Sequence, residues 1–251
     1  MNNFFKTAEE LGGNLPFHSF DLEHFGWLLV ILISIVLMSR IYKAASLNSR
    51  ITLRKSLGIF ILFIELWRKY TLWVLGVFTY ADIPLHLCSL SIYLCFIHAF
   101  KPSKRLDDAL FMLVLPGALA ALLFPDWNVS SHLNFFYIHS WVIHGLLIMY
   151  PIMLMHAGEL IPNRHHIPIV FVSLGLYALP IYFLNKAWNT NFLFINTPSP
   201  GSPMILLEKL FGNPGYVFGL IGLCFIVWFI MYSISGLILK SKARRYTRYS
   251  V

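Results

Sequence analysis

Seven long apolar stretches dominate this sequence of 251 residues and leave little room for a water-soluble fold. Only 12% of the residues are charged, about half of what a soluble domain carries, and 58% are hydrophobic. An α-helix needs about 20 apolar residues to cross a bilayer. The stretches lie at about 25–43, 56–76, 83–100, 107–125, 133–156, 167–185 and 214–239. We therefore expect an all-α polytopic membrane protein, a bundle of seven transmembrane helices that forms one integral membrane domain over residues 1–251.

The basic residues between these stretches gather on one side of the expected membrane. Fourteen fall in alternate connections, namely Arg40, Lys43, Arg50, Arg54, Lys55, Lys101, Lys104, Arg105, Arg164, Lys240, Lys242, Arg244, Arg245 and Arg248. The other side holds only Lys6, Lys186 and Lys209. Cytoplasmic loops carry the excess of lysine and arginine, so we expect the N-terminus outside and the C-terminus in the cytoplasm. The net charge of +8 then reflects topology and contact with anionic lipid, and we expect no nucleic-acid partner.

Two further features indicate the compartment. The first 24 residues hold acidic residues and no apolar run, so we expect no cleavable signal peptide and insertion directed by the first span. Short loops of low charge suit a bacterial cytoplasmic membrane. Cys88, Cys95 and Cys224 all fall within spans, no pair flanks an outer loop, and no C-x-x-C occurs. We expect three free thiols and neither a disulfide framework nor a thiolate zinc site.

Several ionisable side chains lie inside the apolar stretches. Glu65, Arg68 and Lys69 fall in the second stretch, and Asp82 and His86 open the third. The fifth stretch contains His139 and His144. With the orientation above, Glu65 and His144 lie near the middle of the membrane and the other five lie in its outer half. A charge in hydrocarbon is costly, so such residues usually face one another or a watery cavity. We expect one shared polar cavity between helices, open to the outside.

Spacing restricts the pairs that the second stretch can form. Glu65 and Lys69 are four residues apart, and Glu65 and Arg68 are three apart, so either pair can meet on one helix face. Two interpretations follow. The three residues neutralise one another for insertion, or Arg68 or Lys69 binds an anionic group such as a lipid phosphate while Glu65 orients the cation.

The start of the third stretch suggests a catalytic pattern. If Pro84 occupies the first helical turn, Asp82, His86 and Ser89 fall on one helix face. A carboxylate, an imidazole and a hydroxyl in series are the groups that orient a base and activate a nucleophile. The alternative is that Asp82 caps the helix and Ser89 is a packing residue.

Cys88 and the remaining histidines are less easily assigned. Cys88 is two residues from His86, about 200° around a helix, so a dyad within one helix has poor geometry and packing beside Ser91 and Cys95 is expected. Gly145 follows His144 and allows another group to approach its backbone closely. His144 is a satisfied structural donor or, beside the other ionisable spans, a functional residue. His132 and His139 lie on the outer shoulder, as interfacial residues or, for His139, as a contact for substrate. The histidines of the cytoplasmic end are not expected in the site: His98, His156, His165 and His166.

Ordered motifs connect the chain with a known family. The segment Pro84-Leu-His86-Leu-Cys88-Ser89-Leu-Ser-Ile-Tyr-Leu is followed by Pro116-Gly-Ala-Leu-Ala-Ala-Leu-Leu-Phe-Pro125, and then by Phe136-Tyr-Ile-His139 and Ile143-His144-Gly-Leu-Leu-Ile-Met-Tyr-Pro151. Asn185-Lys-Ala-Trp-Asn189-Thr-Asn191-Phe-Leu-Phe and Pro214-Gly-Tyr216 come later. Over about residues 60–235 the chain resembles the YwaF-like bacterial membrane proteins and the related eukaryotic transmembrane protein 164 family.

The resemblance implies an activity and two site residues. The eukaryotic relatives are described as acyltransferases that move a fatty acyl chain between phospholipids through a cysteine, with histidines nearby. His86 and His144 match the two histidines of the family by position. Leu85 stands where the family has its cysteine. Either Cys88 or Ser89 replaces the nucleophile, the reaction has no covalent intermediate, or the bacterial branch has another function.

The leading hypothesis is a lipid acyltransferase or lipid hydrolase that needs no cofactor and acts on a membrane phospholipid or fatty-acyl substrate. His86 or His144 would be the base, and Arg68 the cation near the phosphate or developing oxyanion.

Two alternatives remain open. A metal-dependent lipid hydrolase of the seven-span alkaline-ceramidase kind would use His86, His144 and Asp82 as ligands, although no span has an H-x-x-x-H pair. A non-enzymatic transporter, sensor or assembly factor would also place ionisable residues in the membrane. No inverted repeat is visible, which argues against a secondary transporter. Nothing in the sequence indicates an oligomeric state.

Overall fold

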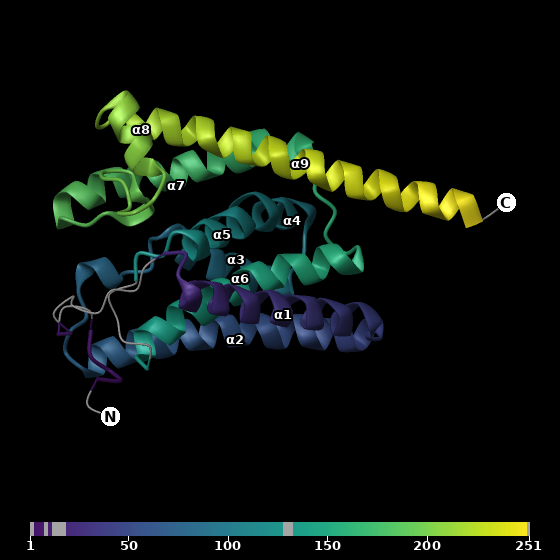
Figure 1. The fold of residues 1–251 in the computed structure, drawn as a ribbon, viewed down its shortest axis with the longest axis horizontal. Helices are drawn as coiled ribbons and strands as arrows, with labels where there is room; N and C mark the ends of the chain where they lie inside the picture. Colours follow the sequence, from purple (N-terminus) through teal and green to yellow (C-terminus); the bar gives the residue numbers. More distant parts are fainter. Residues whose placement is uncertain (1–2, 8–9, 12–18, 128–132, 250–251) are drawn as a thin grey trace.

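A computed structural model describes residues 3–7, 10–11, 19–127 and 133–249, and within these ranges the chain forms helices and no strand. The α-helices, which Figure 1 labels, are α1 (Leu22–Ala44), α2 (Leu47–Val74), α3 (Leu87–Phe100), α4 (Lys104–Ala109), α5 (Leu115–Leu123), α6 (Phe135–Ala157), α7 (Ile167–Trp188), α8 (Met204–Phe211) and α9 (Tyr216–Tyr249). The π-helical turn is η2 (Leu110–Val114), and the 3₁₀ turns are η1 (Tyr80–Asp82), η3 (Arg164–His166) and η4 (Phe192–Phe194). His132 lies outside the described residues.

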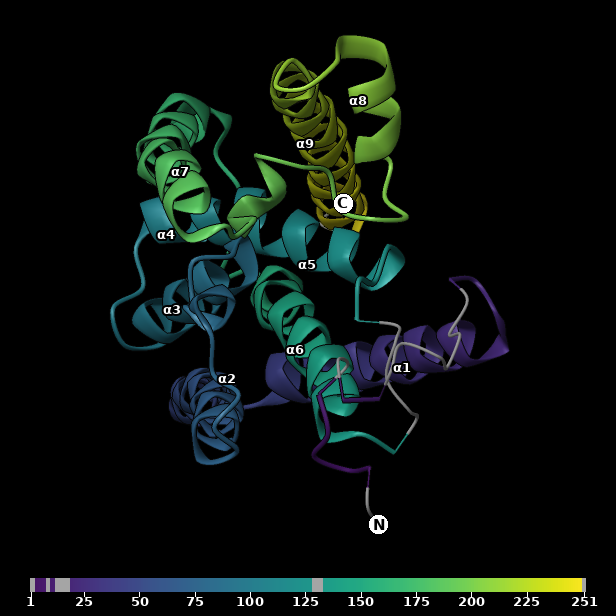
Figure 2. The ribbon, with the colours of Figure 1, turned by 90° about the vertical axis from the view of Figure 1, so that its left-hand side faces the viewer.

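The helix α6 lies at the centre of the bundle. It packs against α1, α2, α3 and α5, and Figure 2 shows it between α1, α2 and α5, with α7, α8 and α9 beyond α4 and α5. Asn134 caps its start by accepting the N–H groups of Phe136 and Tyr137, and Gly158 ends it in a left-handed conformation. Its sequence is apolar on every face, as expected for a helix surrounded by others. Two of the candidate site residues, His139 and His144, therefore lie on a helix that other helices surround.

Six helical stretches of the described residues are long and apolar enough to cross a membrane. They are Leu22–Ala44, Tyr80–Phe100, Lys104–Leu123, Phe135–Ala157, Arg164–Trp188 and Tyr216–Ile238. They correspond to every predicted span except the second. The helix α2 has 28 residues, about 42 Å at 1.5 Å per residue, so length does not disqualify it. Glu65, Arg68 and Lys69 make it more polar than the other six.

The prediction that a helix begins near residue 83 is wrong. The turn η1 ends at Asp82, and Ile83 and His86 are both extended, with ψ angles of 135° and 156°. The α-helix begins only at Leu87. The physical cause is Pro84, whose ring disfavours the helical conformation of the residue before it.

The late helix start changes the site predicted on this segment. Asp82 belongs to a 3₁₀ turn and His86 precedes the helix, so neither shares a regular helix face with Ser89. The carboxylate–imidazole–hydroxyl series expected from the i, i+4 and i+7 spacing is not formed. Asp82 instead forms a capping box with Thr79 at the 3₁₀ turn. Its role is thus capping, as in the alternative interpretation, but of this turn and not of α3.

The irregular backbone ahead of α3 is satisfied by side chains from other helices. The carbonyl oxygen of Asp82 accepts a hydrogen bond from Lys69 Nζ, and that of Leu85 accepts one from the Tyr177 hydroxyl at 3.1 Å. Non-helical backbone at membrane depth is tolerated where protein groups take the place of water. The sequence before Cys88 can therefore remain extended within the bundle.

A π-helical turn connects the outer layer of helices to the core. It lies between α4 and α5, and the carbonyl of its Met112 accepts a hydrogen bond from Trp228 Nε1 of α9 at 2.7 Å. Trp228 is only 3% exposed. A π-turn alters the regular i→i+4 pattern, so a carbonyl is available to an external donor.

We expect Trp228→Phe to lower the free energy of unfolding by about 1–2 kcal/mol, because the substitution removes the indole donor that reaches across to Met112 while preserving most of the volume. The same substitution at Trp73, which is 69% exposed, is the matched control and should have little effect. Unfolding in mixed micelles measures both. Equal stability of the two variants would contradict a stabilising role for the hydrogen bond between Trp228 and Met112.

Candidate functional site

Glu65 is the centre of a buried ion cluster. Its side chain is 10% exposed, and its Oε1 lies 3.2 Å from Lys69 Nζ and 3.8 Å from Arg68 Nη1. Its Oε2 lies 3.4 Å from Nε2 of His139, on α6. The i, i+3 and i, i+4 contacts that spacing allowed are thus both present on α2.

Asp82 adds a second carboxylate from the segment before α3. Its Oδ1 lies 3.4 Å from Arg68 Nη2, and its Oδ2 accepts hydrogen bonds from the N–H and hydroxyl of Thr79, each at 3.0 Å. Two carboxylates, those of Glu65 and Asp82, therefore face the two cations of Arg68 and Lys69. This balance lowers the cost of placing four charges within the bundle.

His139 is the least satisfied member of the cluster. Its residue exposure is 8%, and the contact of its Nε2 with Glu65 lacks the angle of a hydrogen bond. His139 is consequently an internal group rather than the interfacial residue that its place near the start of the helix suggested.

His144 contacts Cys88 across two helices. Nε2 of His144, on α6, lies 3.1 Å from Sγ of Cys88, on α3. Nδ1 of the same ring lies 2.7 Å from the carbonyl oxygen of Ser140. A carbonyl oxygen can only accept, so Nδ1 carries the proton, and in the neutral ring Nε2 has a lone pair directed at the thiol. The arrangement is that of a nucleophile, a base and a group that orients the base.

Trp127 fixes the plane of the His144 ring. The two rings are stacked, with centroids 4.8 Å apart and an interplanar angle of 6°. Trp127 in turn meets Trp141 of α6 edge to face at 5.6 Å. Stacking on one face and the Ser140 bond at Nδ1 leave little freedom for the imidazole, so Nε2 remains aimed at Cys88.

The close approach predicted at Gly145 comes from α1. A Cβ added to Gly145 would lie 3.1 Å from Cγ1 of Ile31. The absence of a side chain lets α1 pack tightly on α6 next to His144. This glycine therefore supports the site through helix packing.

His86 and Ser89 do not join this pair through a hydrogen bond. The His86 ring lies 5.2 Å from the rings of both Phe192 and Phe194 of η4, and it forms no hydrogen bond with a described residue. The Ser89 hydroxyl likewise has no hydrogen-bond partner in the described ranges. Cys88, which the single-helix argument assigned to packing, is the group that meets a histidine. Of its expected neighbours, Cys95 is fully buried and Ser91 bonds the carbonyl of Leu87 at 2.7 Å.

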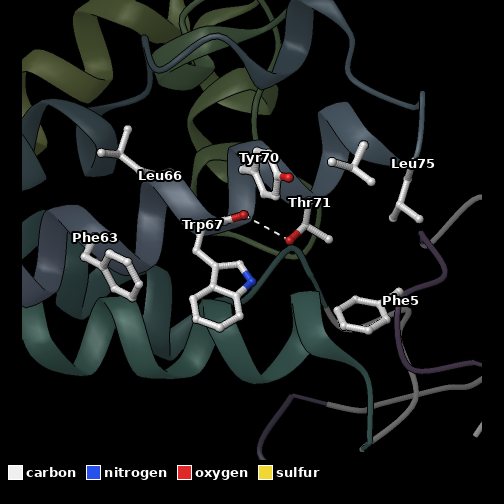
Figure 3. Close-up of a pocket in the computed structure, with 8 residues that line it drawn as sticks. Phe5, Phe63, Leu66, Trp67, Tyr70, Thr71 and Leu75 are labelled. Carbon is white, nitrogen blue, oxygen red and sulfur yellow. Dashed lines mark hydrogen bonds between the residues drawn. The ribbon is translucent and has the colours of Figure 1, made fainter.

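An apolar groove lies on the other face of α2 (Figure 3), with a volume of about 670 Å³. Its lining consists of Phe5, Phe63, Leu66, Trp67, Tyr70, Thr71, Val74 and Leu75. The Thr71 hydroxyl is bonded to the carbonyl of Trp67 at 3.0 Å, so it does not add an unpaired polar group to the wall. The groove suits an apolar chain, and it flanks the turn of α2 that carries Arg68 and Lys69.

The described residues contain no group of three or more histidine, cysteine, aspartate or glutamate side chains able to hold a metal ion. His86, His144 and Asp82, the ligands of the metal-dependent alternative, each have other partners: aromatic rings, a thiol and a cation cluster.

The fold and site together define a multi-span helical membrane protein with a thiol–imidazole pair beside an ion cluster between helices. The model of the TMEM164 family matches residues 19–232, so the chain belongs to the TMEM164 family. The matched range includes every candidate site residue. Searches of the curated proteins and of the solved structures give no match.

We expect Glu65→Gln to destabilise the protein by about 2 kcal/mol, because it leaves two partly buried cations facing one carboxylate. The double variant Glu65→Gln with Lys69→Met restores the charge balance and should recover much of this loss. Thermal unfolding in detergent of the single and double variants measures the coupling. Strictly additive effects would show that the pair has no energetic role.

Proposed function

We propose that this protein is a membrane-embedded lipid acyltransferase in which Cys88 is the nucleophile and His144 is the general base. The observation that supports this most strongly is the 3.1 Å contact between Nε2 of His144 and Sγ of Cys88, with Nδ1 held by the Ser140 carbonyl. Membership of the TMEM164 family is compatible with it. Cys88 then takes the place of the cysteine that Leu85 replaces.

The reaction proceeds in two steps. In the first, the Cys88 thiol gives its proton to His144, its sulfur attacks an ester carbonyl of a phospholipid, and the ester C–O bond breaks. The lysophospholipid oxygen leaves with the proton from the imidazolium, and a thioester remains on Cys88. In the second, an acceptor hydroxyl attacks the thioester carbonyl, His144 takes its proton and returns it to the sulfur as the C–S bond breaks. With water as acceptor, the same steps amount to lipid hydrolysis.

The substrate-binding groups we assign are on α2. The Arg68 side chain remains 26% exposed while it pairs with Glu65 and Asp82, so one more anionic oxygen can reach it. In our proposal this oxygen belongs to the lipid phosphate, Lys69 and His139 hold the two carboxylates in place, and the groove of Figure 3 receives an acyl chain. His86 has a supporting role at the start of α3, two residues before Cys88.

The topology that this function needs includes α2 as a seventh span, with the N-terminus outside, the C-terminus in the cytoplasm and the site in the outer half of a bacterial cytoplasmic membrane. In Figure 2 α2 lies beside α3 and α6, against which it packs. Its packing on α3 is close, since a Cβ added to Gly58 would lie 2.6 Å from Cβ of Ala99. A helix packed this closely in the bundle, with its charges paired inward, can cross a bilayer despite its polarity.

We expect Cys88→Ala to abolish transfer of a labelled acyl chain from phosphatidylcholine to a lysophospholipid in nanodiscs, with a loss of about 100-fold or more, because no thioester can form. Mass spectrometry of the lipids measures the rate. Cys95→Ala is the matched control and should remain active, since Cys95 lies on the same helix but is packed in the core of the bundle. Wild-type rates in both variants would overturn the assignment of the nucleophile.

We expect His144→Ala to slow the same reaction by about 100-fold and also to slow alkylation of Cys88 by a membrane-permeant maleimide, because the thiol loses its proton acceptor. His156→Ala provides the control, since His156 is an exposed residue near the other end of α6. Unchanged alkylation in His144→Ala would mean that this histidine does not act on the thiol.

A further inference from the structure

A second polar cavity lies at the other end of α2, α3 and α6 from the ion cluster. Its volume is about 280 Å³. The polar residues in its wall are Arg54, His98, Ser103, Lys104, Asp107 and Glu159. The proposed acyl transfer uses none of them.

One wall of this cavity is rigid and fully hydrogen-bonded. Nε2 of His98 lies 2.9 Å from Oδ1 of Asp107, and Nδ1 lies 2.9 Å from the hydroxyl of Tyr150. Oδ2 of Asp107 accepts a hydrogen bond from Lys104 Nζ at 3.2 Å. Both oxygens of this carboxylate and both nitrogens of the imidazole are therefore engaged within the protein.

The opposite wall contains an arginine with unused donors. Nε of Arg54 donates to the carbonyl of Ala99 at 3.3 Å, and Nη1 lies 3.8 Å from Glu159, beyond hydrogen-bond distance. Glu159 already accepts the Tyr42 hydroxyl at 2.7 Å and faces Arg50 at 3.4 Å. Among the described residues the Nη groups of Arg54 thus have no hydrogen-bond acceptor, although the side chain is only 14% exposed. A guanidinium has five N–H donors, so the Nη groups of Arg54 can still bind an acceptor in the cavity.

The charged groups in and around the cavity also carry a net positive charge. In the wall, Arg54 and Lys104 carry positive charge and Asp107 and Glu159 carry negative charge. Arg50, which lies outside the wall and pairs with Glu159, adds a third positive charge. One singly charged anion would complete the balance. Arginine binds phosphate oxygens in a bidentate manner, and the cavity is close to the small end of ligand sites, so it fits a phosphate group rather than a whole lipid.

We propose that this cavity binds a phosphate-bearing anion through the Nη groups of Arg54 and through Lys104. The phosphodiester of an anionic lipid headgroup and free phosphate share this chemistry. The basic residues expected around this end of the bundle would draw anionic lipids toward the cavity. The site lies apart from Cys88 and His144, and it holds whether or not those residues transfer acyl chains.

The test uses the full chain, purified in neutral detergent without phosphate, and follows its melting temperature against three probes. They are dioctanoyl phosphatidylglycerol, inorganic phosphate and dioctanoylglycerol, which has the same chains and no phosphate. A ligand that binds the folded state raises the melting temperature in a saturable manner. A rise with phosphatidylglycerol alone identifies a lipid headgroup, and a rise with inorganic phosphate identifies the free anion. Equal rises with dioctanoylglycerol, or no rise with any probe, would overturn the proposal.

Matched variants attribute the effect to the cavity. We expect Arg54→Gln to weaken the apparent affinity by about tenfold or more, Arg54→Lys to weaken it less, and Arg105→Gln to leave it unchanged. Arg105 is an exposed arginine of α4 outside the cavity, so it controls for net charge. If Arg54→Gln does not fold, Lys104→Gln replaces it, because the Lys104 side chain is 67% exposed and can be changed without unfolding. Wild-type affinity in the cavity variants would refute the site.

Discussion

The bundle is organised by one constraint: a polar group inside a membrane must find its partner within the protein, because hydrocarbon offers none. Glu65 and Asp82 each face a cation, and the extended segment before α3 gives its carbonyls to Lys69 and Tyr177. The same requirement explains Met112 and Trp228 between the layers. Each polar atom that is satisfied in this way also fixes one element against another.

The central helix α6 contributes a histidine to each of the two parts of the candidate site. His139 and His144 are five residues apart, about 140° around the helix, so they face different neighbours. His139 faces Glu65 on α2, and His144 faces Cys88 on α3. One helix therefore connects the ion cluster that we assign to substrate binding with the thiol that we assign to chemistry. Trp127 and the Ser140 carbonyl keep the imidazole of His144 in the orientation that the thiol requires.

Features that depend on local spacing could be predicted from the sequence. Contacts between residues that are distant along the chain could not. Apolar length located six spans, and i, i+4 spacing anticipated the Glu65–Lys69 pair. The helix starts at Leu87 and not near residue 83 because Pro84 disfavours the helical conformation of Ile83, a signal that the sequence contains. The Cys88–His144 contact joins residues 56 positions apart, and its formation depends on helix order and rotation, which one sequence does not encode locally. A cysteine on one apolar span and a histidine on another were the only available hint.

The most direct measurement is mass analysis of the protein during turnover with a phospholipid that carries a heavy-isotope acyl chain. The account predicts that the heavy acyl mass appears on the peptide containing Cys88 and that neutral hydroxylamine removes it, as it removes a thioester. A protein that turns over lipid while Cys88 stays unmodified at every time point would contradict the account.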